Sequence, residues 1–170
     1  MPYVIRFFIL LSVVLLAACC RTPEPKVDLQ AEENKAIVRR YLMDVWSEGN
    51  LSLVDEIFSR DFVGYTSGKE SERGIEGVKQ LVSRFRTAFP DIHYTIEDEI
   101  VEGDKVVTRW TARATHKGDW AGITPTNKQV IYTGMNIFRI AGGKIVEEYF
   151  EFDSCNFLQQ LGAVPPPAHE

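Results

Sequence analysis

The sequence predicts an α+β domain in which a strongly bent antiparallel sheet wraps around three N-terminal helices. Up to Pro90, apolar residues recur at helical spacing in three segments. From Ile92 onward they alternate with polar residues over four segments separated by turn signals. Helices first and antiparallel strands afterwards are typical of a cone that is open at one end.

The first helix begins near Asp28, a good cap residue, and ends at Gly49-Asn50. A short second helix follows over residues 51–58. The third helix runs over residues 74–89, with Ile75, Val78, Leu81, Val82, Phe85 and Phe89 on one stripe, and Pro90 ends it. Each of the three helices therefore offers an apolar face to the sheet.

Period-two alternation defines the strands. A short strand is expected over residues 61–65, before the third helix. The main strands are expected over residues 92–100, 106–117, 130–140 and 145–152. A turn at Gly103-Asp104 joins the first two, a loop over 118–127 the next two, and Gly142-Gly143 the last hairpin. A helix over residues 154–161 completes the domain and ends at Gly162.

The N-terminus is typical of a secretory signal peptide over residues 1–18. Arg6 precedes the apolar run Phe7 to Leu16, which is too short to span a bilayer comfortably. Leu16-Ala17-Ala18-Cys19 resembles the lipobox of bacterial lipoproteins, and this resemblance implies that Cys19 is acylated and anchors the chain. An ordinary signal peptide with a chance cysteine stays open, because Arg6 is the sole basic residue before the run.

By the lipoprotein interpretation, the protein faces the periplasm or the cell exterior and is anchored in the bacterial cell envelope. Residues 19–30, with Pro23 and Pro25, form a tether. The folded domain spans residues 31–163, and residues 164–170 form a flexible tail.

Charge and cysteine content exclude several classes of function. The net charge is −5 at pH 7, or −6 once Arg6 is removed, and no basic stripe indicates nucleic-acid binding. The three cysteines are too few for a disulfide framework, and Cys155 is expected to be buried. The three histidines lack metal-ligand spacing, so no metal and no organic cofactor are expected.

Several strands carry apolar residues at both even and odd positions, which point to opposite faces of the sheet. Val130 and Tyr132 on one face and Ile131 and Met135 on the other are an example. Both faces of the sheet are then partly buried, although the helices cover one of them. We therefore expect a homodimer that forms through the other face.

A series of short motifs carries a family resemblance. In chain order the motifs are Arg109-Trp110-Thr111-Ala112, Thr115-His116-Lys117-Gly118, Gly122-Ile123-Thr124-Pro125-Thr126, Phe138-Arg139-Ile140, Gly143-Lys144-Ile145-Val146-Glu147 and Gln160-Leu161-Gly162. Together they resemble the SnoaL-like polyketide cyclase or ester cyclase family of the nuclear transport factor 2-like superfamily. The resemblance implies an α+β cone with a deep pocket, commonly dimeric and without metal or organic cofactor.

In the characterised cyclases, an acidic residue on the last strand is the general acid/base for an intramolecular aldol closure. This chain departs from that pattern. Phe150 holds the position of the catalytic aspartate, and Asn136 replaces a pocket histidine. The cyclase reaction itself is therefore in doubt.

Glu148 is the best remaining acid or base, because it shares a strand face with Phe150. A solvated Glu148 on an edge-like strand is the open alternative. Asn136 is a candidate to stabilise a carbonyl or enolate oxygen, or else an asparagine satisfied by backbone groups. A two-residue Gly142-Gly143 turn would put Asn136 opposite Tyr149. The family's pairing, with a glycine bulge in the last hairpin, instead implies that Asn136 lies opposite Phe150 and beside Glu148.

Further candidates surround the expected pocket. Aromatic side chains offer walls or ordinary core packing: Tyr65, Trp110, Trp120, Tyr132 and Phe150. His116 either closes the rim near the 118–127 loop or holds a loop carbonyl. Asp153 either caps the last helix or contacts the pocket.

Two functions follow from these residues. In the first, a pocket binds a small hydrophobic carbonyl compound and performs cofactor-free acid/base chemistry of cyclase or isomerase type. In the second, a lipid-anchored protein binds a small molecule without chemistry. The identity of the ligand does not follow from the sequence.

Overall fold

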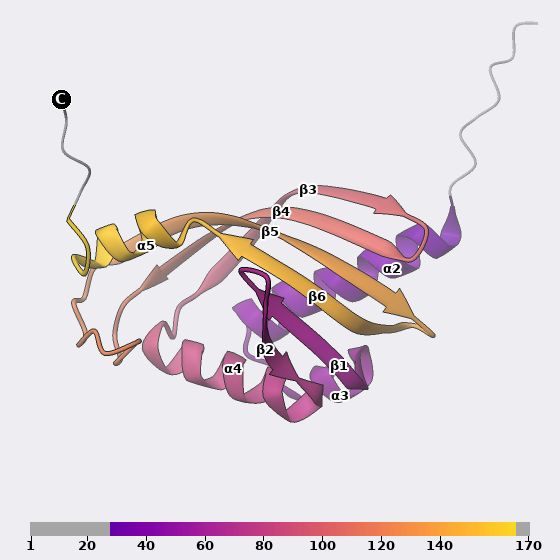
Figure 1. Ribbon diagram of the computed structural model, residues 1–170, viewed down its shortest axis with the longest axis horizontal. Helices are drawn as coiled ribbons and strands as arrows, with labels where there is room; N and C mark the ends of the chain where they lie inside the picture. The colour runs from indigo at the N-terminus through magenta and orange to yellow at the C-terminus, as the bar shows by residue number, and fades with distance from the viewer. Residues whose placement is uncertain (1–27, 166–170) are drawn as a thin grey trace, which may run out of the picture.

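The structure, a computed structural model, describes residues 28–165. It confirms the α+β fold, with helices on one side of a six-stranded sheet of order β2-β1-β6-β5-β4-β3 (Figure 1). The helices are α2 (Leu29–Arg40), η1 (Tyr41–Ser47), α3 (Ser52–Ile57), α4 (Gly74–Ala88) and α5 (Ser154–Leu161). The strands are β1 (Phe58–Thr66), β2 (Lys69–Arg73), β3 (His93–Glu102), β4 (Lys105–Thr115), β5 (Gln129–Ala141) and β6 (Lys144–Phe152).

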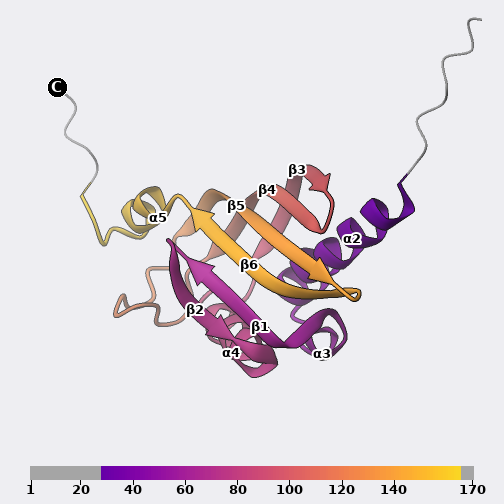
Figure 2. The same ribbon diagram turned by 45° about the vertical axis from the view of Figure 1, so that its right-hand side comes forward.

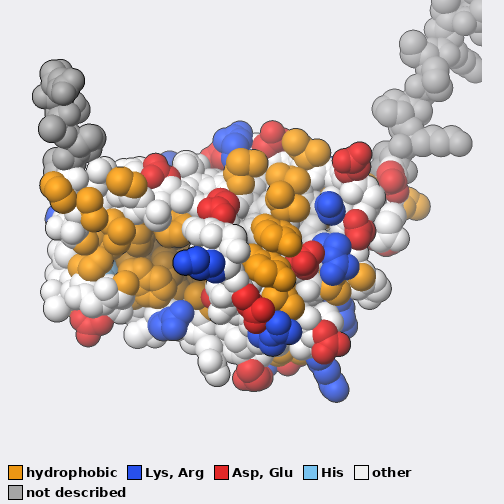
Figure 3. Space-filling view, viewed as in Figure 1, with side chains coloured by type: hydrophobic (Ala, Val, Ile, Leu, Met, Phe, Trp, Pro, Cys, Tyr) orange, Lys and Arg blue, Asp and Glu red, His pale blue; other side chains and the backbone are white. Residues whose placement is uncertain are grey.

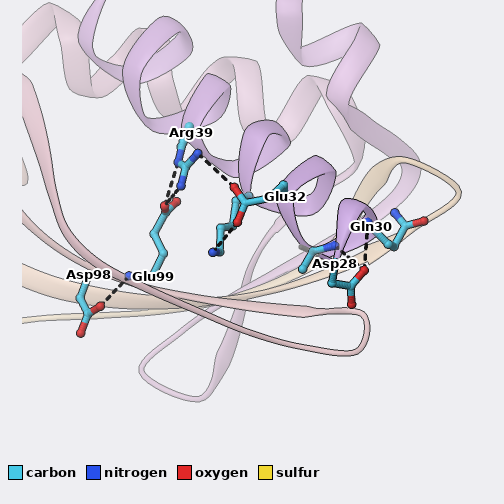
Figure 4. Close-up of polar contacts among 8 residues, drawn as sticks. Asp28, Gln30, Glu32, Arg39, Asp98 and Glu99 are labelled. Atoms are coloured by element: carbon cyan, nitrogen blue, oxygen red, sulfur yellow. Dashed lines mark hydrogen bonds and ion pairs between the residues drawn. The ribbon is translucent and has the colours of Figure 1, made fainter. Parts of the chain in front are cut away.

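Helix α2 begins as the cap residue predicts. The Asp28 carboxylate accepts hydrogen bonds from the backbone N–H groups of Gln30 (3.1 Å) and Ala31 (3.4 Å). Farther along the helix, the Arg39 guanidinium pairs with Glu99 on β3, which ties the helix to the sheet (Figure 4). Because residues 29 and 30 are helical, the predicted tether is wrong at its last two residues. Its other residues, apart from Asp28, and the predicted signal lie outside the described part of the chain.

The helix continues without a break into η1, a π-helical segment with a wider turn. The backbone N–H of Glu48 bonds to the carbonyl of Met43, five residues earlier. Within this segment Tyr41, Leu42, Val45 and Trp46 are all buried. The wider turn thus presents more than one side of the helix to the interior.

The sheet is mixed, not wholly antiparallel as expected. Strand β1 is longer than the predicted 61–65 segment and pairs in parallel with β6. Strand β2 was not predicted. Its sequence, Lys-Glu-Ser-Glu-Arg, contains no apolar residue, so no period-two pattern marks it. Strands β3 to β6 match the predicted strands, apart from shifts at their ends.

Bulges help to bend the sheet. Register shifts occur between Gly64 and Tyr65, between Ile96 and Asp98, and between Arg139 and Ile140. On the inner face, aromatic and aliphatic side chains from the helices and strands form one buried core. The bent sheet and the helices therefore enclose the interior from opposite sides (Figure 2).

The outer face of the sheet keeps exposed apolar residues: Ile100, Ile131, Met135, Ile137 and Tyr149. Figure 3 shows hydrophobic side chains gathered over the strands in that view. The prediction for Cys155 is wrong, because its side chain is exposed near the start of α5. None of the helices within residues 28–165 is long and apolar enough to cross a membrane.

Candidate functional site

A cavity of about 290 Å³ lies between the sheet and the helices η1 and α4. This volume is close to the lower end of the range for small-molecule pockets. Half of the lining residues are aromatic: Tyr41, Trp46, Tyr65, Phe85, Tyr94, Trp120, Tyr132, Phe150 and Phe152. The polar part of the wall comes from Thr66, Ser71, Glu72, Arg84, Asn136 and Glu148. The cavity thus combines an apolar body with a few convergent polar groups.

Glu148 lies on β6 and its side chain faces the cavity, where the residue is 8% exposed. The pKa of its carboxyl is raised from 4.5 to about 8. Burial is the largest cause and the negative charge of Glu72 adds to it, while hydrogen bonding from Asn136 and Tyr41 opposes the rise. At neutral pH most Glu148 side chains therefore carry a proton, and the alternative of a solvated carboxylate does not hold.

Asn136 on β5 holds Glu148 in place. The strand pairing puts Asn136 opposite Phe150, as the family's pairing predicts. The predicted glycine bulge is wrong, because Gly142-Gly143 is a two-residue turn and the register shifts farther along, between Arg139 and Ile140. Its amide nitrogen Nδ2 donates to Oε1 of Glu148, and its oxygen Oδ1 accepts from Nε1 of Trp110 at 2.5 Å. An indole N–H can only donate, so this bond fixes the orientation of the amide. Since Oε1 of Glu148 accepts from Asn136, we assign the proton of the neutral acid to Oε2.

Trp110 does not line the cavity, in contrast to the prediction. It is fully buried and stacks on Phe150 with ring centroids 5.8 Å apart. The backbone of Gly134 passes against the ring, since a Cβ there would lie 2.3 Å from Trp110 Cζ2. Trp110 therefore supports the site from behind by holding Asn136 and Phe150.

The other sequence candidates divide into two groups. Tyr65, Trp120, Tyr132 and Phe150 line the cavity, as does the pair formed by Asn136 and Glu148. The structure does not place His116 and Asp153 among the lining residues.

His116 is fully buried, and its Nδ1 accepts a hydrogen bond from the backbone N–H of Thr126 at 3.2 Å. It therefore holds the loop between β4 and β5. Asp153 caps α5 by accepting from the N–H of Asn156 at 3.0 Å. The capping alternative for Asp153 is thus confirmed. His116 holds the loop as its alternative supposed, but through a backbone N–H and not through a carbonyl.

Sequence reasoning named six of the eighteen lining residues and missed the other twelve, of which three matter most for the chemistry of the site. Tyr41 belongs to the apolar stripe of the first helix and gave no sign of facing a cavity. Glu72 lies on β2, which the sequence pattern does not reveal. Arg84 on α4 lies with its guanidinium carbon 5.9 Å from the centre of the Trp120 ring. No group of three or more His, Cys, Asp or Glu residues within 28–165 could hold a metal ion.

Comparisons with known proteins agree with this geometry. A family model described as SnoaL-like polyketide cyclase matches residues 36–161. The search of curated proteins found no match.

Solved structures give the same picture. AclR, a proposed hydroxylase from Streptomyces galilaeus, is 28% identical with a TM-score of 0.72, over 81% of this chain and 86% of AclR. IdmH, a proposed polyketide cyclase from Streptomyces antibioticus, is 27% identical with a TM-score of 0.67, over 76% of this chain and 98% of IdmH. A proposed polyketide cyclase from Bacillus cereus is 30% identical with a TM-score of 0.66, over 78% of this chain and 82% of that one.

The family match covers most of the folded domain, and the similar structures share its helices, its bent sheet and their arrangement. The chain therefore belongs to the SnoaL-like polyketide cyclase family and has the nuclear transport factor 2-like fold.

Proposed function

We propose that this protein binds a small hydrophobic carbonyl compound in its cavity and performs cofactor-free acid/base chemistry on it, of cyclase or isomerase type. One arrangement supports this function above all others. A buried carboxyl whose pKa is raised to about 8 faces an aromatic cavity and is held by Asn136. A carboxylic acid that is neutral near pH 7 can give a proton and take it back.

In this mechanism Glu148 is the acid. Its Oε2 donates to the carbonyl oxygen of the bound compound, which stabilises the negative charge that develops there when a neighbouring carbon loses a proton. Asn136 uses one Nδ2 hydrogen on Glu148, and the second hydrogen is a candidate donor to the same ligand oxygen. The aromatic wall excludes water and so strengthens both interactions.

Phe150 sets this chain apart from the characterised cyclases. It lines the cavity at the position that the resemblance assigns to their catalytic aspartate. Glu148, two residues earlier on the same strand face, is the carboxyl that takes over the acid/base role in our proposal.

A second function has its own support, namely binding without chemistry. Phe150 in place of the aspartate and the mainly apolar wall favour a carrier that holds an apolar guest. In that case the Glu148 proton serves only to bond the guest's oxygen.

The binding step can be tested with 2-tetralone, a small bicyclic ketone, by isothermal titration calorimetry. We expect the wild-type protein to bind it, and a Leu81→Trp variant, which fills the cavity from α4, to lose binding with an unchanged circular dichroism spectrum. Native mass spectrometry of protein purified from its own membrane should in addition show a bound carbonyl compound. Equal binding by wild type and Leu81→Trp would place the guest elsewhere and contradict both functions.

We further propose that Cys19 carries the lipid anchor and that the domain stands in the bacterial cell envelope, facing the periplasm or the cell exterior. Two acyl chains hold a protein to a membrane far more firmly than one. Mass spectrometry of the mature N-terminus tests this directly. An acylated Cys19 is expected, and an unmodified Cys19 at the mature terminus would contradict it.

A further inference from the structure

A second carboxyl shares the cavity wall with Glu148. Strands β2, β1 and β6 are adjacent (Figure 2), and their register puts Glu72, Gly64 and Glu148 in one lateral row. Residues opposite one another on neighbouring strands point to the same face of a sheet. The Cα atoms of the two glutamates are therefore roughly 10 Å apart, two strand spacings, with no side chain between them.

Gly64 keeps the space between the two carboxyls open. A Cβ at this position would lie 3.1 Å from Oε2 of Glu72 and 3.3 Å from the ring of Phe62. The Glu72 carboxylate thus extends over Gly64 toward Glu148, and both glutamates line the cavity. Their proximity has an electrostatic result, because the charge of Glu72 contributes to the raised pKa of Glu148.

Hydroxyl groups hold Glu72 in this position. Oγ of Ser71 donates to Oε2 of Glu72, and Oγ1 of Thr66 donates to Oγ of Ser71 at 3.1 Å. Both hydroxyl residues also line the cavity. None of the ion pairs among residues 28–165 includes Glu72. Its carboxylate is therefore oriented without being neutralised.

We propose that Glu72 is the catalytic base of the site, opposite Glu148 as the acid. This inference rests on the proposed acid/base function and assigns its second proton-transfer group. Glu72 suits the task because it is half-buried and still reaches solvent, whereas Glu148 is 8% exposed. A base that meets water can release the proton it has taken.

The step balances in atoms and charge. The Glu72 carboxylate takes a proton from the carbon next to the ligand's carbonyl. The C–H electron pair forms a carbon–carbon double bond while the C=O π bond breaks, and the oxygen receives the proton of Glu148. The result is a neutral enol, a protonated Glu72 and an ionised Glu148, so the total charge is unchanged. In the return step Glu72 gives a proton to the same or, in a conjugated ligand, another carbon, while the enol O–H gives its proton back to Glu148. The C=O bond re-forms, both glutamates regain their starting states, and an exchange or an isomerisation is complete.

The test uses 2-tetralone in D₂O, with NMR spectroscopy following the replacement of the protons next to its carbonyl by deuterium. Wild-type protein is expected to accelerate the exchange above the buffer rate. Glu72→Gln should reduce the protein-catalysed rate by about 100-fold or more, the usual contribution of a positioned acid or base. The matched control, Glu70→Gln on the same strand, removes an exposed carboxylate paired with Arg73 and should keep the wild-type rate.

The outcomes separate the base from the proposed function as a whole. If Glu72→Gln exchanges at the wild-type rate while Glu148→Gln loses the exchange, the assignment of Glu72 as the base is overturned and that of Glu148 as the acid stands. If the wild-type protein does not accelerate the exchange above the buffer rate, both the assignment of Glu72 and the proposed acid/base function are overturned.

A second readout does not depend on activity. In a carbon-13 titration of the Glu148 carboxyl, Glu72→Gln should lower its pKa, because a neighbouring negative charge is removed. An unchanged pKa would show that the two carboxyls do not interact and would overturn the inference.

Discussion

Burial makes Glu148 a neutral acid, and Asn136, whose amide is occupied at both ends, fixes the position of its carboxyl. Trp110 supplies a donor that the amide oxygen must face, so the amide nitrogen must face Glu148. The carboxyl then offers one oxygen to Asn136 and the other to the cavity. Without this chain of contacts a buried glutamate would have no fixed proton position.

The raised pKa of Glu148 makes stability depend on pH with a definite sign. In the unfolded chain the carboxyl ionises near 4.5, but in the folded protein it ionises near 8. Its stabilising contribution is therefore fully present below pH 4.5 and is lost as the pH rises through 8. We expect the free energy of unfolding to fall across this window by roughly 3 to 5 kcal/mol.

The variant Glu148→Gln should remove this fall, because glutamine keeps the shape of the neutral acid and does not ionise. Urea denaturation at several pH values from 4 to 9 measures the effect. At pH 8 the variant should be more stable than the wild type, and at pH 4 the two should agree. Glu151→Gln, an exposed change on the same strand, should follow the wild-type curve. The idea of a neutral Glu148 fails if Glu148→Gln shows the same pH dependence as the wild type.

The helices and strands that local sequence patterns encode could be predicted from the sequence. The cap at Asp28 and strands β3 to β6 each follow from short-range signals, and the structure confirms them. The placement of Asn136 beside Glu148 followed from the family resemblance, because the residues alone left the register of the last hairpin open, and the structure confirms it.

Other parts of the site could not be predicted, because they depend on contacts between distant segments. Strand β1 pairs with β6 across about half of the chain, and no local period reports a parallel pairing. Strand β2 is wholly polar, so Glu72 looked like one more surface charge. Tyr41 reaches the cavity because the helix widens at η1, which the apolar spacing alone does not show.

Two glycines in different elements give opposite predictions for the same change. Gly134→Ala on β5 would put a methyl group 2.3 Å from Trp110 and 2.6 Å from the carbonyl oxygen of Glu151, so it should destabilise the protein by about 1 to 3 kcal/mol. Gly77→Ala in α4 meets nothing closer than 3.6 Å and should stabilise it by about 0.5 to 1 kcal/mol.

Thermal and urea unfolding of both variants check this pair of predictions. If Gly134→Ala were as stable as the wild type, the close packing of the Gly134 backbone against the Trp110 ring would not contribute to stability as we expect. Gly77→Ala controls for the general effect of adding a methyl group to a glycine.

For the whole molecule, we propose a homodimer through the outer face of the sheet. Met135, Ile137 and Tyr149 are each more than 40% exposed there. Beside them, Arg139 and Glu147 form an ion pair at 3.1 Å. An apolar centre with a polar rim is the usual anatomy of a protein interface. The same patch on two copies would meet around a two-fold axis.

Light scattering at micromolar concentration tests this assembly. Wild-type protein should have the mass of a dimer, and Ile137→Lys the mass of a monomer, because a charge would be buried in the interface. Leu29→Lys, at a residue 73% exposed at the start of α2, should remain dimeric. A monomeric wild-type protein would contradict the proposal and leave the cavity unaffected.

A carbon-13 NMR titration of the Glu148 carboxyl in the wild-type protein shows whether the cavity holds a neutral carboxylic acid. The resonance can be assigned by its loss in Glu148→Gln. A midpoint near pH 8 is the predicted result. A midpoint near 4.5, the value of a solvated glutamate, would contradict the account.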